Sequence, residues 1–242
     1  MIYAASCIGE GKKECEDSIL VGSRLLSDTC QVLPVPSEGF ICVADGVGGN
    51  KGGKAASSFV LGAVSTATPE FDGLAASIGT INVGLIEQSK KSPQLSGMAT
   101  TLTGICKKDE AFVLVHIGNS RAYVLQGRYL KQITPDHTTY SWLKSMGRLA
   151  EAEACNRSEI VSCLGGGDIQ LAHKLYIQAV SSFGTMLLTT DGIHDYVSID
   201  ALEAILSTND GGAEKCSAII QAAKHADSPD DLSVVLICLH ED

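Results

Sequence analysis

The sequence predicts an α+β protein in which two antiparallel β-sheets are stacked and covered by helices. Three observations support this class. Short apolar runs typical of strands outnumber the helical patterns, and several follow one another with only brief polar breaks. The helical patterns occur in pairs, set apart from the strands. Because single strands do not alternate with single helices, a parallel βαβ array is not expected.

The N-terminal part of the chain is expected to hold three strands followed by two helices. Apolar residues at three- and four-residue intervals predict a helix from Gly52 to about Thr66. A similar stripe predicts a second helix from about Glu70 to Lys91, which Pro93 ends. The three preceding strands are short apolar runs, at Ile2–Cys7, Ser18–Gly22 and Gly39–Ala44.

The rest of the chain starts with strands and continues with mixed elements. Four strands are expected close together, with the breaks KKDE, GNS and QGR as hairpin turns, and together they predict an antiparallel meander. These strands are Ala99–Cys106, Ala111–Gly118, Arg121–Leu125 and Tyr129–Thr134. The remaining predictions are a helical stretch at Thr138–Cys155, strands at Ile169–Ala179, Gly184–Thr190 and Leu232–His240, and helices at Ile199–Ser207 and Ala213–Ala226.

Composition narrows the class of protein. The 242 residues are 45% hydrophobic and 19% charged, which is typical of a globular chain. A net charge of −10 argues against a protein that coats nucleic acid. Apolar runs are too short for a membrane helix or a signal peptide. Nine cysteines without a C-x-x-C pair indicate reduced thiols. We expect a cytoplasmic protein with no membrane partner, in which residues 1–242 form a single domain.

Acidic residues lie at the ends of four expected strands. Glu16 and Asp17 precede the strand that begins at Ser18, and Asp45-Gly46 follows the run GFICVA. Asp191-Gly192 follows TMLLTT, and Asp230-Asp231 precedes LSVVLICL. Any one Asp-Gly pair is best explained as a turn signal. Four acidic strand ends at one edge of a sandwich instead predict a cluster of carboxylates.

Such a cluster points to bound cations. Carboxylates a few ångströms apart repel each other, and one is protonated when no positive charge compensates. Oxygen ligands suit Mg²⁺, Mn²⁺ or Ca²⁺, and zinc much less. Glycine after aspartate allows a sharp turn that brings a carbonyl oxygen near the ion. The sequence therefore predicts a divalent-metal site.

Seven segments, taken in order, identify a family. GKKECED, ICVADGVGGNKGGKAAS, GMATTL, IGNSRAYVL, LKQITPDHT, LLTTDGIHDYV and SPDDLSVVLI resemble the motifs of the metal-dependent protein phosphatases, also called the type 2C protein phosphatases. The resemblance extends from about Gly9 to His240, and the compact length is similar to the bacterial and archaeal members. It implies an αββα sandwich with two Mn²⁺ or Mg²⁺ ions, and hydrolysis of phosphoserine and phosphothreonine in proteins.

The resemblance also implies a role for each matching residue. Asp45 would bridge the two ions and the Gly46 carbonyl would bind one of them, while Asp191 and Asp230 would complete the shell of the other. Glu16 and Asp17 match a catalytic acidic pair that holds the centre largely through water. Water between two cations has a lowered pKa, so it would attack phosphorus directly, without a phosphoenzyme.

Several residues depart from the family pattern. Asn119 replaces an aspartate that binds a third metal in many bacterial members, so that site is expected to be weakened or absent. Asp195 is either a second ligand of this weakened site or a surface acid. Lys12 stands where the family has an arginine that grips the substrate phosphate, so phosphate binding is expected to be weaker. Asp231 replaces an asparagine, and Val47 replaces a histidine suggested as a proton donor.

The sequence thus favours a Ser/Thr protein phosphatase that acts on phosphorylated proteins made by a Ser/Thr kinase. We expect a monomer. One alternative, motivated by Lys12 and Asn119, is a degenerate phosphatase that serves as a phosphoprotein-binding or regulatory module. Another is a different two-metal hydrolase such as a nuclease or nucleotidase, which the lack of a basic stripe disfavours.

Overall fold

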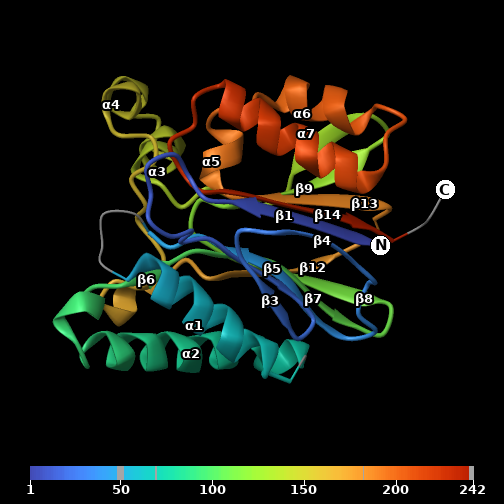
Figure 1. The fold of residues 1–242 in the computed structure, drawn as a ribbon. Helices are drawn as coiled ribbons and strands as arrows, with labels where there is room; N and C mark the ends of the chain where they lie inside the picture. Colours follow the sequence, from blue (N-terminus) through green and yellow to red (C-terminus); the bar gives the residue numbers. More distant parts are fainter. Residues whose placement is uncertain (48–51, 69, 182, 240–242) are drawn as a thin grey trace.

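Two six-stranded antiparallel sheets stack face to face, and helices cover both outer faces (Figure 1). Helices α1 (Gly53–Ser65) and α2 (Leu74–Ser89) cover one sheet, and α6 (Ile199–Leu206) and α7 (Gly212–His225) cover the other. The expected αββα sandwich is confirmed. The computed structural model describes residues 1–47, 52–68, 70–181 and 183–239.

Each sheet is assembled from strands that are far apart in the sequence. The first sheet has the order β10 (Tyr129–Gln132), β9 (Arg121–Gln126), β13 (Thr185–Thr189), β14 (Leu232–Cys238), β1 (Ile2–Cys7) and β4 (Cys30–Leu33). The second has the order β12 (Tyr176–Val180), β8 (Ala111–Ile117), β7 (Leu102–Lys108), β5 (Gly39–Ala44), β2 (Ser18–Val21) and β3 (Arg24–Leu26). Strands β6 (Ala99–Thr100) and β11 (Leu164–Gly165) form a small ribbon beside them.

Shorter helical elements complete the chain. Near one end of the sandwich lie α3 (Thr139–Ser145), α4 (Leu149–Ala154) and α5 (Asp191–His194) (Figure 1). Single 3₁₀ turns occur at Phe71–Gly73, Pro93–Leu95 and Ile169–Ala172. Among the described residues, no helix combines the length and the apolar character needed to span a bilayer.

Three apolar layers hold the sandwich together. The first lies between α1, α2 and the second sheet, the next lies between the two sheets, and the third lies between the first sheet and α5 to α7. In α1 the buried residues Ala56, Val60, Leu61 and Val64 recur at helical spacing and form one face. Each sheet is therefore covered on both faces, which agrees with the continuous apolar runs of its central strands.

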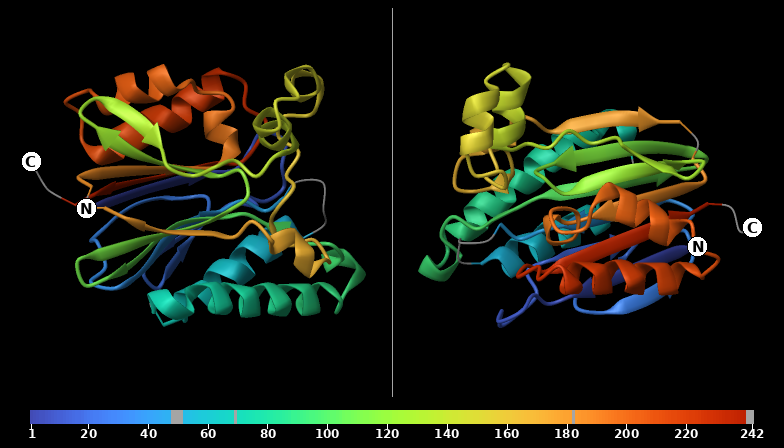
Figure 2. Two further views of the ribbon diagram at one scale, coloured as in Figure 1. Left: turned by 180° about the vertical axis from the view of Figure 1, so that it is seen from behind. Right: turned by 90° about the horizontal axis from the view of Figure 1, so that it is seen from above.

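The expected four-strand meander is wrong at its middle connection. β7 and β8 form one hairpin and β9 and β10 form another, but β8 pairs with β12 while β9 pairs with β13. The GNS break, with Gly118 at a φ of +111°, therefore carries the chain from one sheet to the other instead of turning a hairpin. Views from behind and above show these two hairpins in different layers (Figure 2).

Other differences are local. The expected strand over Ile169–Ala179 starts with a 3₁₀ turn, and only Tyr176–Val180 is strand. The helical stretch Thr138–Cys155 is divided into α3 and α4 near Gly147, whose φ of +73° no helix accommodates. Strands β3 and β4 were not expected, and the final strand ends at Cys238, while His240 lies outside the described residues. All nine cysteines are free, as expected from their spacing.

Candidate metal centre

Four strand ends bring acidic residues together at one end of the sandwich. In the second sheet, Ser18 of β2 pairs with Ala44 of β5, so Asp17 and Asp45 leave neighbouring strands side by side. In the first sheet, β13 leads into Asp191, and β14 begins directly after Asp230 and Asp231. This is the end near α3 and α5 in Figure 1, opposite the N-terminus. The cluster therefore draws on both sheets.

The backbone around Asp45 is held firmly. The Asp45 N–H donates to Thr101 Oγ1 at 2.9 Å, and the Asp45 carbonyl accepts from the Thr100 hydroxyl at 2.7 Å and from the Thr101 N–H at 2.9 Å. Thr100 and Thr101 are fully buried. The Asp45 side chain thus projects from a fixed position, as a ligand or charged catalytic group requires.

Several oxygens in this cluster are buried without a hydrogen-bond partner. Asp17 is fully buried, and its Oδ2 accepts from the Thr190 hydroxyl at 2.8 Å, but its Oδ1 has no partner. The same holds for Asp191 Oδ1 and Asn119 Oδ1. These three are the only such side-chain atoms in the part of the chain that is described. Buried polar atoms are normally satisfied, so three together indicate that something else binds there.

The electrostatics of the cluster also indicates that a cation binds there. Burial, then the neighbouring charges of Asp191, Asp17 and Asp230, raise the pKa of Asp45 well above its usual value. Burial is also the main cause that raises the pKa of Asp17, to about 7, and that of Asp191. Burial and mutual repulsion thus disfavour the charged forms of these carboxyl groups, and a divalent ion would supply the compensating positive charge.

Glu16 and the Gly46 carbonyl meet at the start of α1. A Cβ atom on Gly53 would lie 2.5 Å from Glu16 Oε1 and 3.1 Å from the Gly46 oxygen. Only glycine at position 53 leaves room for both oxygens. Burial raises the pKa of Glu16 above its ordinary value. Gly46 and Glu16, each predicted as a site residue, therefore place two further oxygens close together.

Lys12 contacts the cluster directly. Its Nζ donates to Asp230 Oδ1 and, at 3.0 Å, to Asp231 Oδ2, and it lies 3.6 Å from Glu16 Oε2. Burial lowers the pKa of Lys12, but the hydrogen bonds to Asp230 and Asp231 outweigh this and raise it overall. Lys12 is thus paired with acidic side chains and not directed into solvent.

Asn119 and Asp195 lie on the side of the cluster toward α3 and α4. Asn119 Nδ2 donates to Asp191 Oδ2 at 2.8 Å, and Asp195 Oδ2 accepts from the Ser158 hydroxyl at 3.0 Å. A cavity of about 510 Å³ adjoins them, lined also by Arg121 and Tyr196. Burial raises the pKa of Asp195. The two residues are therefore near one another, but each is bonded to a different protein group.

The residues fit a divalent cation by their chemistry. They are hard oxygen donors, three of their atoms are buried and unpartnered, and their carboxyl groups raise one another's pKa. Among the described residues, however, no three Asp, Glu, His or Cys side chains converge as a ready-made ligand group. Two of the expected ligands already have partners within the protein, since Lys12 donates to Asp230 and Asn119 donates to Asp191.

Other contacts near the site were not anticipated from the sequence. Arg121 forms a two-pronged ion pair with Asp136, at 2.9 and 2.6 Å, beside the cavity. Ser158 had no sequence signal at all. His137 and His194 have structural roles, since His137 Nδ1 accepts from the Gly118 N–H and His194 Nδ1 bonds to the Thr189 hydroxyl.

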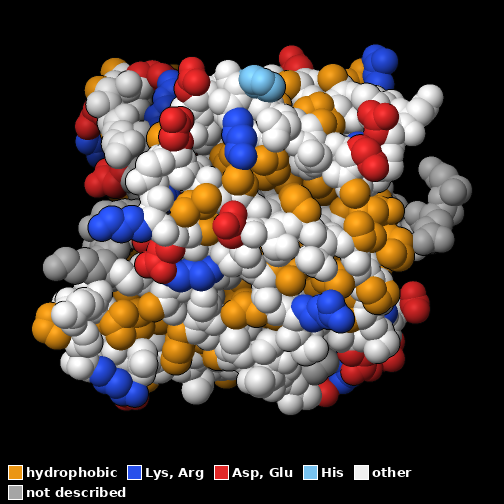
Figure 3. Space-filling view, viewed as in Figure 1, with side chains coloured by type: hydrophobic (Ala, Val, Ile, Leu, Met, Phe, Trp, Pro, Cys, Tyr) orange, Lys and Arg blue, Asp and Glu red, His pale blue; other side chains and the backbone are white. Residues whose placement is uncertain are grey.

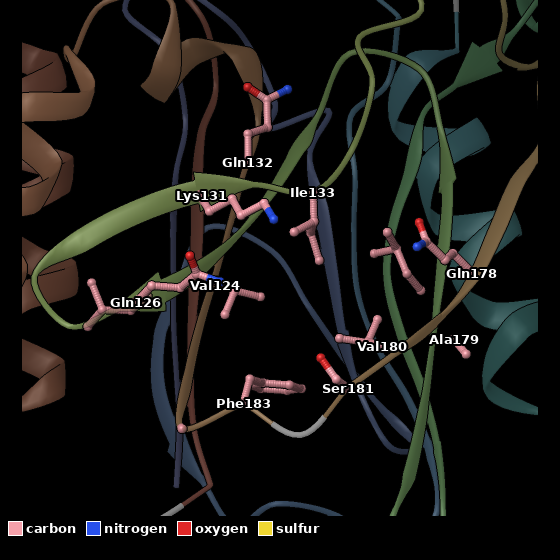
Figure 4. A pocket seen from close by; sticks show the side chains of 13 residues that line it. Val124, Gln126, Lys131, Gln132, Ile133, Gln178, Ala179, Val180, Ser181 and Phe183 are labelled. Carbon is pink, nitrogen blue, oxygen red and sulfur yellow. The ribbon is translucent and has the colours of Figure 1, made fainter.

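A second hollow lies away from this site. It measures about 530 Å³ and opens between β9–β10 and β12 (Figure 4). Val124, Ile133, Gln178 and Phe183 line it, and none of its described lining residues is acidic. On the face shown in Figure 3, Lys and Arg side chains are scattered among acidic ones and form no continuous stripe.

Comparison with known proteins places this geometry in context. No family model matches the chain. It is 32% identical over 230 residues to the serine/threonine protein phosphatase PstP of Mycobacterium tuberculosis, an alignment that covers 91% of this chain and 41% of PstP. It is 27% identical over 209 residues to the serine/threonine phosphatase stp of Listeria monocytogenes, covering 81% and 83% of the two chains. This chain therefore spans less than half of the length of PstP.

Solved structures agree with the sequence comparisons. The crystal structure of the M. tuberculosis phosphatase PstP/Ppp superposes with a TM-score of 0.81 at 28% identity, over 100% of this chain and 99% of that one. Stp1 from Staphylococcus aureus, at 23% identity and a TM-score of 0.82 over 99% and 95% of the two chains, shares the fold. Sequence and fold thus both relate this chain to serine/threonine protein phosphatases. The predicted resemblance to the metal-dependent protein phosphatase family is therefore confirmed.

Proposed function

We propose that this chain is a metal-dependent serine/threonine protein phosphatase and that residues 1–242 form its catalytic domain. One observation carries the proposal. Buried carboxylate oxygens from both sheets lie together at one end of the sandwich, and one oxygen of each of Asp17 and Asp191, the Oδ1 atom, has no hydrogen-bond partner. A bound divalent cation would satisfy these oxygens and neutralise the cluster at neutral pH. The names of the relatives PstP and stp support a phosphorylated protein as the substrate.

The resemblance assigns a role to each of these residues. Asp45, the Gly46 carbonyl, Asp191 and Asp230 would hold two Mn²⁺ or Mg²⁺ ions, with Glu16 and Asp17 beside them. When bound, such ions lower the pKa of water and neutralise the oxygens of a phosphate ester.

The protein groups around the metal centre would bind and orient the phosphorylated side chain. The Lys12 ammonium would supply a positive charge for the phosphate. Hydrolysis would not pass through a phosphoenzyme, so it needs no protein nucleophile. The cavity beside Asn119, lined by Arg121 and Tyr196, offers room for the residues that flank the phosphorylated side chain. The substrate would therefore be a phosphorylated segment of a protein, generated by a Ser/Thr kinase. We further propose that the protein acts as a cytoplasmic monomer.

Hydrolysis of p-nitrophenyl phosphate and of a phosphothreonine peptide tests this function. Turnover should require Mn²⁺ or Mg²⁺, should stop with EDTA, and should fall at least about 10³-fold in Asp45→Ala. Asp200→Ala removes an exposed acid at the start of α6 and serves as the control, with activity near that of the wild type. Nucleotides and plasmid DNA in the same assay test for another two-metal hydrolase. Clean, folded protein without metal-dependent turnover would instead indicate a regulatory or phosphoprotein-binding module.

A further inference from the structure

Lys12 already occupies a cation position within the acidic cluster. Its Nζ bonds to Asp230 Oδ1 and Asp231 Oδ2 and lies 3.6 Å from Glu16 Oε2, so one ammonium contacts three carboxylates. Among the described residues, no other Lys or Arg forms an ion pair with these acids. A lysine ammonium is a compact charge on a flexible stem, so it can serve as a counter-ion and still move.

Asp231 is the buried anchor of Lys12. The Asp231 side chain is 1% exposed, its Oδ1 accepts from the Gly9 N–H at 2.8 Å, and its Oδ2 accepts from the Glu16 N–H at 2.8 Å. Both ends of the loop that carries Lys12 are therefore tied to one carboxylate. A buried carboxylate of this kind needs a positive partner, which keeps Lys12 near the cluster even if another contact breaks.

Asp230 is the contact that can be exchanged. Its side chain is 41% exposed, and its Oδ1 accepts from both the Lys12 ammonium and the Asp231 N–H. The same carboxylate is needed as a ligand in the proposed metal centre. A metal ion and an ammonium at this carboxylate would repel each other, since like charges a few ångströms apart interact strongly at a partly buried site.

We propose that Lys12 is a built-in counter-ion that competes with the metal for Asp230, and that metal binding displaces the ammonium while Asp231 keeps it beside the site. This inference rests on the proposed metal dependence and adds to it. Lys12 would set the metal affinity of this chain, and loading the metal would release the ammonium for an incoming phosphate. Metal binding and phosphate capture would thereby be linked through one side chain.

Binding of Mn²⁺ alone to the full chain tests the proposal without an activity assay. Free Mn²⁺ is measured by electron paramagnetic resonance during titration of metal-free protein. Lys12→Met keeps the length of the side chain but removes its charge, and should tighten Mn²⁺ binding by about fivefold or more. Lys13→Met removes the same charge from an exposed neighbour and should change the affinity less than about twofold. Lys12→Arg keeps a cation and should remain close to the wild type.

A double variant separates this effect from misfolding and from net charge. Lys12→Met with Asp231→Asn removes both members of the buried pair, so the chain keeps its net charge and leaves no unpaired buried carboxylate at position 231. It should also bind Mn²⁺ about fivefold more tightly or better. Wild-type or weaker Mn²⁺ affinity in both the single and the double variant would overturn the competition.

The two proposals fail in different ways. If wild-type protein binds Mn²⁺ and hydrolyses phosphothreonine while both Lys12 variants bind Mn²⁺ unchanged, the role of Lys12 is refuted and the phosphatase function stands. If neither the wild type nor any variant binds Mn²⁺ or hydrolyses the ester, the proposed function is refuted together with the competition.

Discussion

Asn119 differs from an aspartate by one terminal group, and its amide Nδ2 donates a hydrogen bond to Asp191 Oδ2 at 2.8 Å. The Nδ2 donor partly offsets the carboxylate charge, while the buried Oδ1 has no partner. The amide therefore stabilises the cluster when metal is removed, but supplies only a weak metal ligand.

Asn119→Asp should reverse this balance. A carboxylate beside Asp191 removes a hydrogen bond and adds repulsion, so the free energy of unfolding in EDTA should fall by about 2 kcal/mol. In excess Mn²⁺ the variant should bind one more ion than the wild type, counted by equilibrium dialysis. Asn156→Asp, an exposed change on the same side, is the control and should alter neither quantity. An unchanged ion count would remove Asn119 from the account of the third site.

Asp17 should make the metal-free protein less stable as pH rises. Its pKa is raised from 3.8 in the unfolded chain to about 7 in the fold, chiefly by burial. Below pH 4 both states are protonated, and between pH 4 and 7 only the folded state keeps the proton. The contribution of Asp17 to stability is therefore present at low pH and lost as pH rises through 7.

Asp17→Asn isolates this contribution. The buried histidines, whose pKa values are lowered by burial, titrate alike in both proteins and cancel in the difference. Relative to the wild type, the variant should gain on the order of 3 kcal/mol between pH 4.5 and 7.5 in EDTA, measured by urea unfolding. A difference that does not vary with pH would show that the Asp17 carboxyl titrates normally.

At this scale the sequence could predict which residues matter but not their partners. Asp45 and Asp191 were identifiable because each follows an apolar strand and precedes glycine. The bond from Lys12 to Asp230 joins residues 218 positions apart, and that from Ser158 to Asp195 crosses from the α3–α4 segment to α5. Such contacts depend on how the two sheets stack, which no local pattern contains.

The bounds of a single strand could be predicted from the sequence where burial gives the strand an unbroken apolar run. β1 and β5 match the expected bounds because their residues are almost all buried, so the apolar runs are unbroken. β3 and β4 escaped prediction because Arg24–Leu26 and Cys30–Leu33 are short and mostly exposed. The GNS connection was misread because its length suits a hairpin, while the strand pairing that decides it is nonlocal.

The close approach of β5 and β7 depends on a glycine, Gly104, which has no side chain. It lies in β7 opposite Cys42 of β5, and a Cβ atom there would be 2.1 Å from the Ile41 carbonyl oxygen and 2.5 Å from the Cys42 Cα. These are backbone atoms of a central strand, so they cannot move aside cheaply. Because Asp45 directly follows the last residue of β5, a shift between β5 and β7 would also move a ligand of the proposed metal centre.

Gly104→Ala should therefore lower the free energy of unfolding by about 3 kcal/mol or more. Gly79→Ala is the matched control in α2, where nothing lies within 4 Å of the added methyl group. That change should raise stability by about 0.5–1 kcal/mol, since alanine favours a helix more than glycine does. Urea unfolding of both variants decides the matter, and equal effects would contradict the close approach of β5 and β7.

The whole molecule is a stack of two sheets, and the proposed metal centre lies at one end, between them. One apolar layer, with Ile19 and Val43 from one sheet and Leu188 and Val235 from the other, fixes how the sheets stack. Asp17 and Asp45 leave one sheet, and Asp191 and Asp230 leave the other. A cation held by all four would act as a cross-link between the sheets, and the sheets in turn determine where the ligands lie.

Mn²⁺ should consequently stabilise the entire fold and not only the loops that bind it. A ligand at about 100 times its Kd adds about 2.7 kcal/mol, which for a chain of this length corresponds to a rise in Tm of about 5–10 °C. The rise should be smaller at pH 5.5 than at pH 7.5, because the raised pKa values of Asp45 and Asp191 leave protons that the metal must displace.

Differential scanning calorimetry with EDTA, with Mn²⁺ and with NaCl at matched ionic strength measures this rise in Tm. NaCl relieves only the general repulsion of a chain with net charge −10 and should give a small shift. Asp45→Asn should lose most of the Mn²⁺ shift, and an equal shift in this variant would mean that the ion does not join the two sheets at the predicted site.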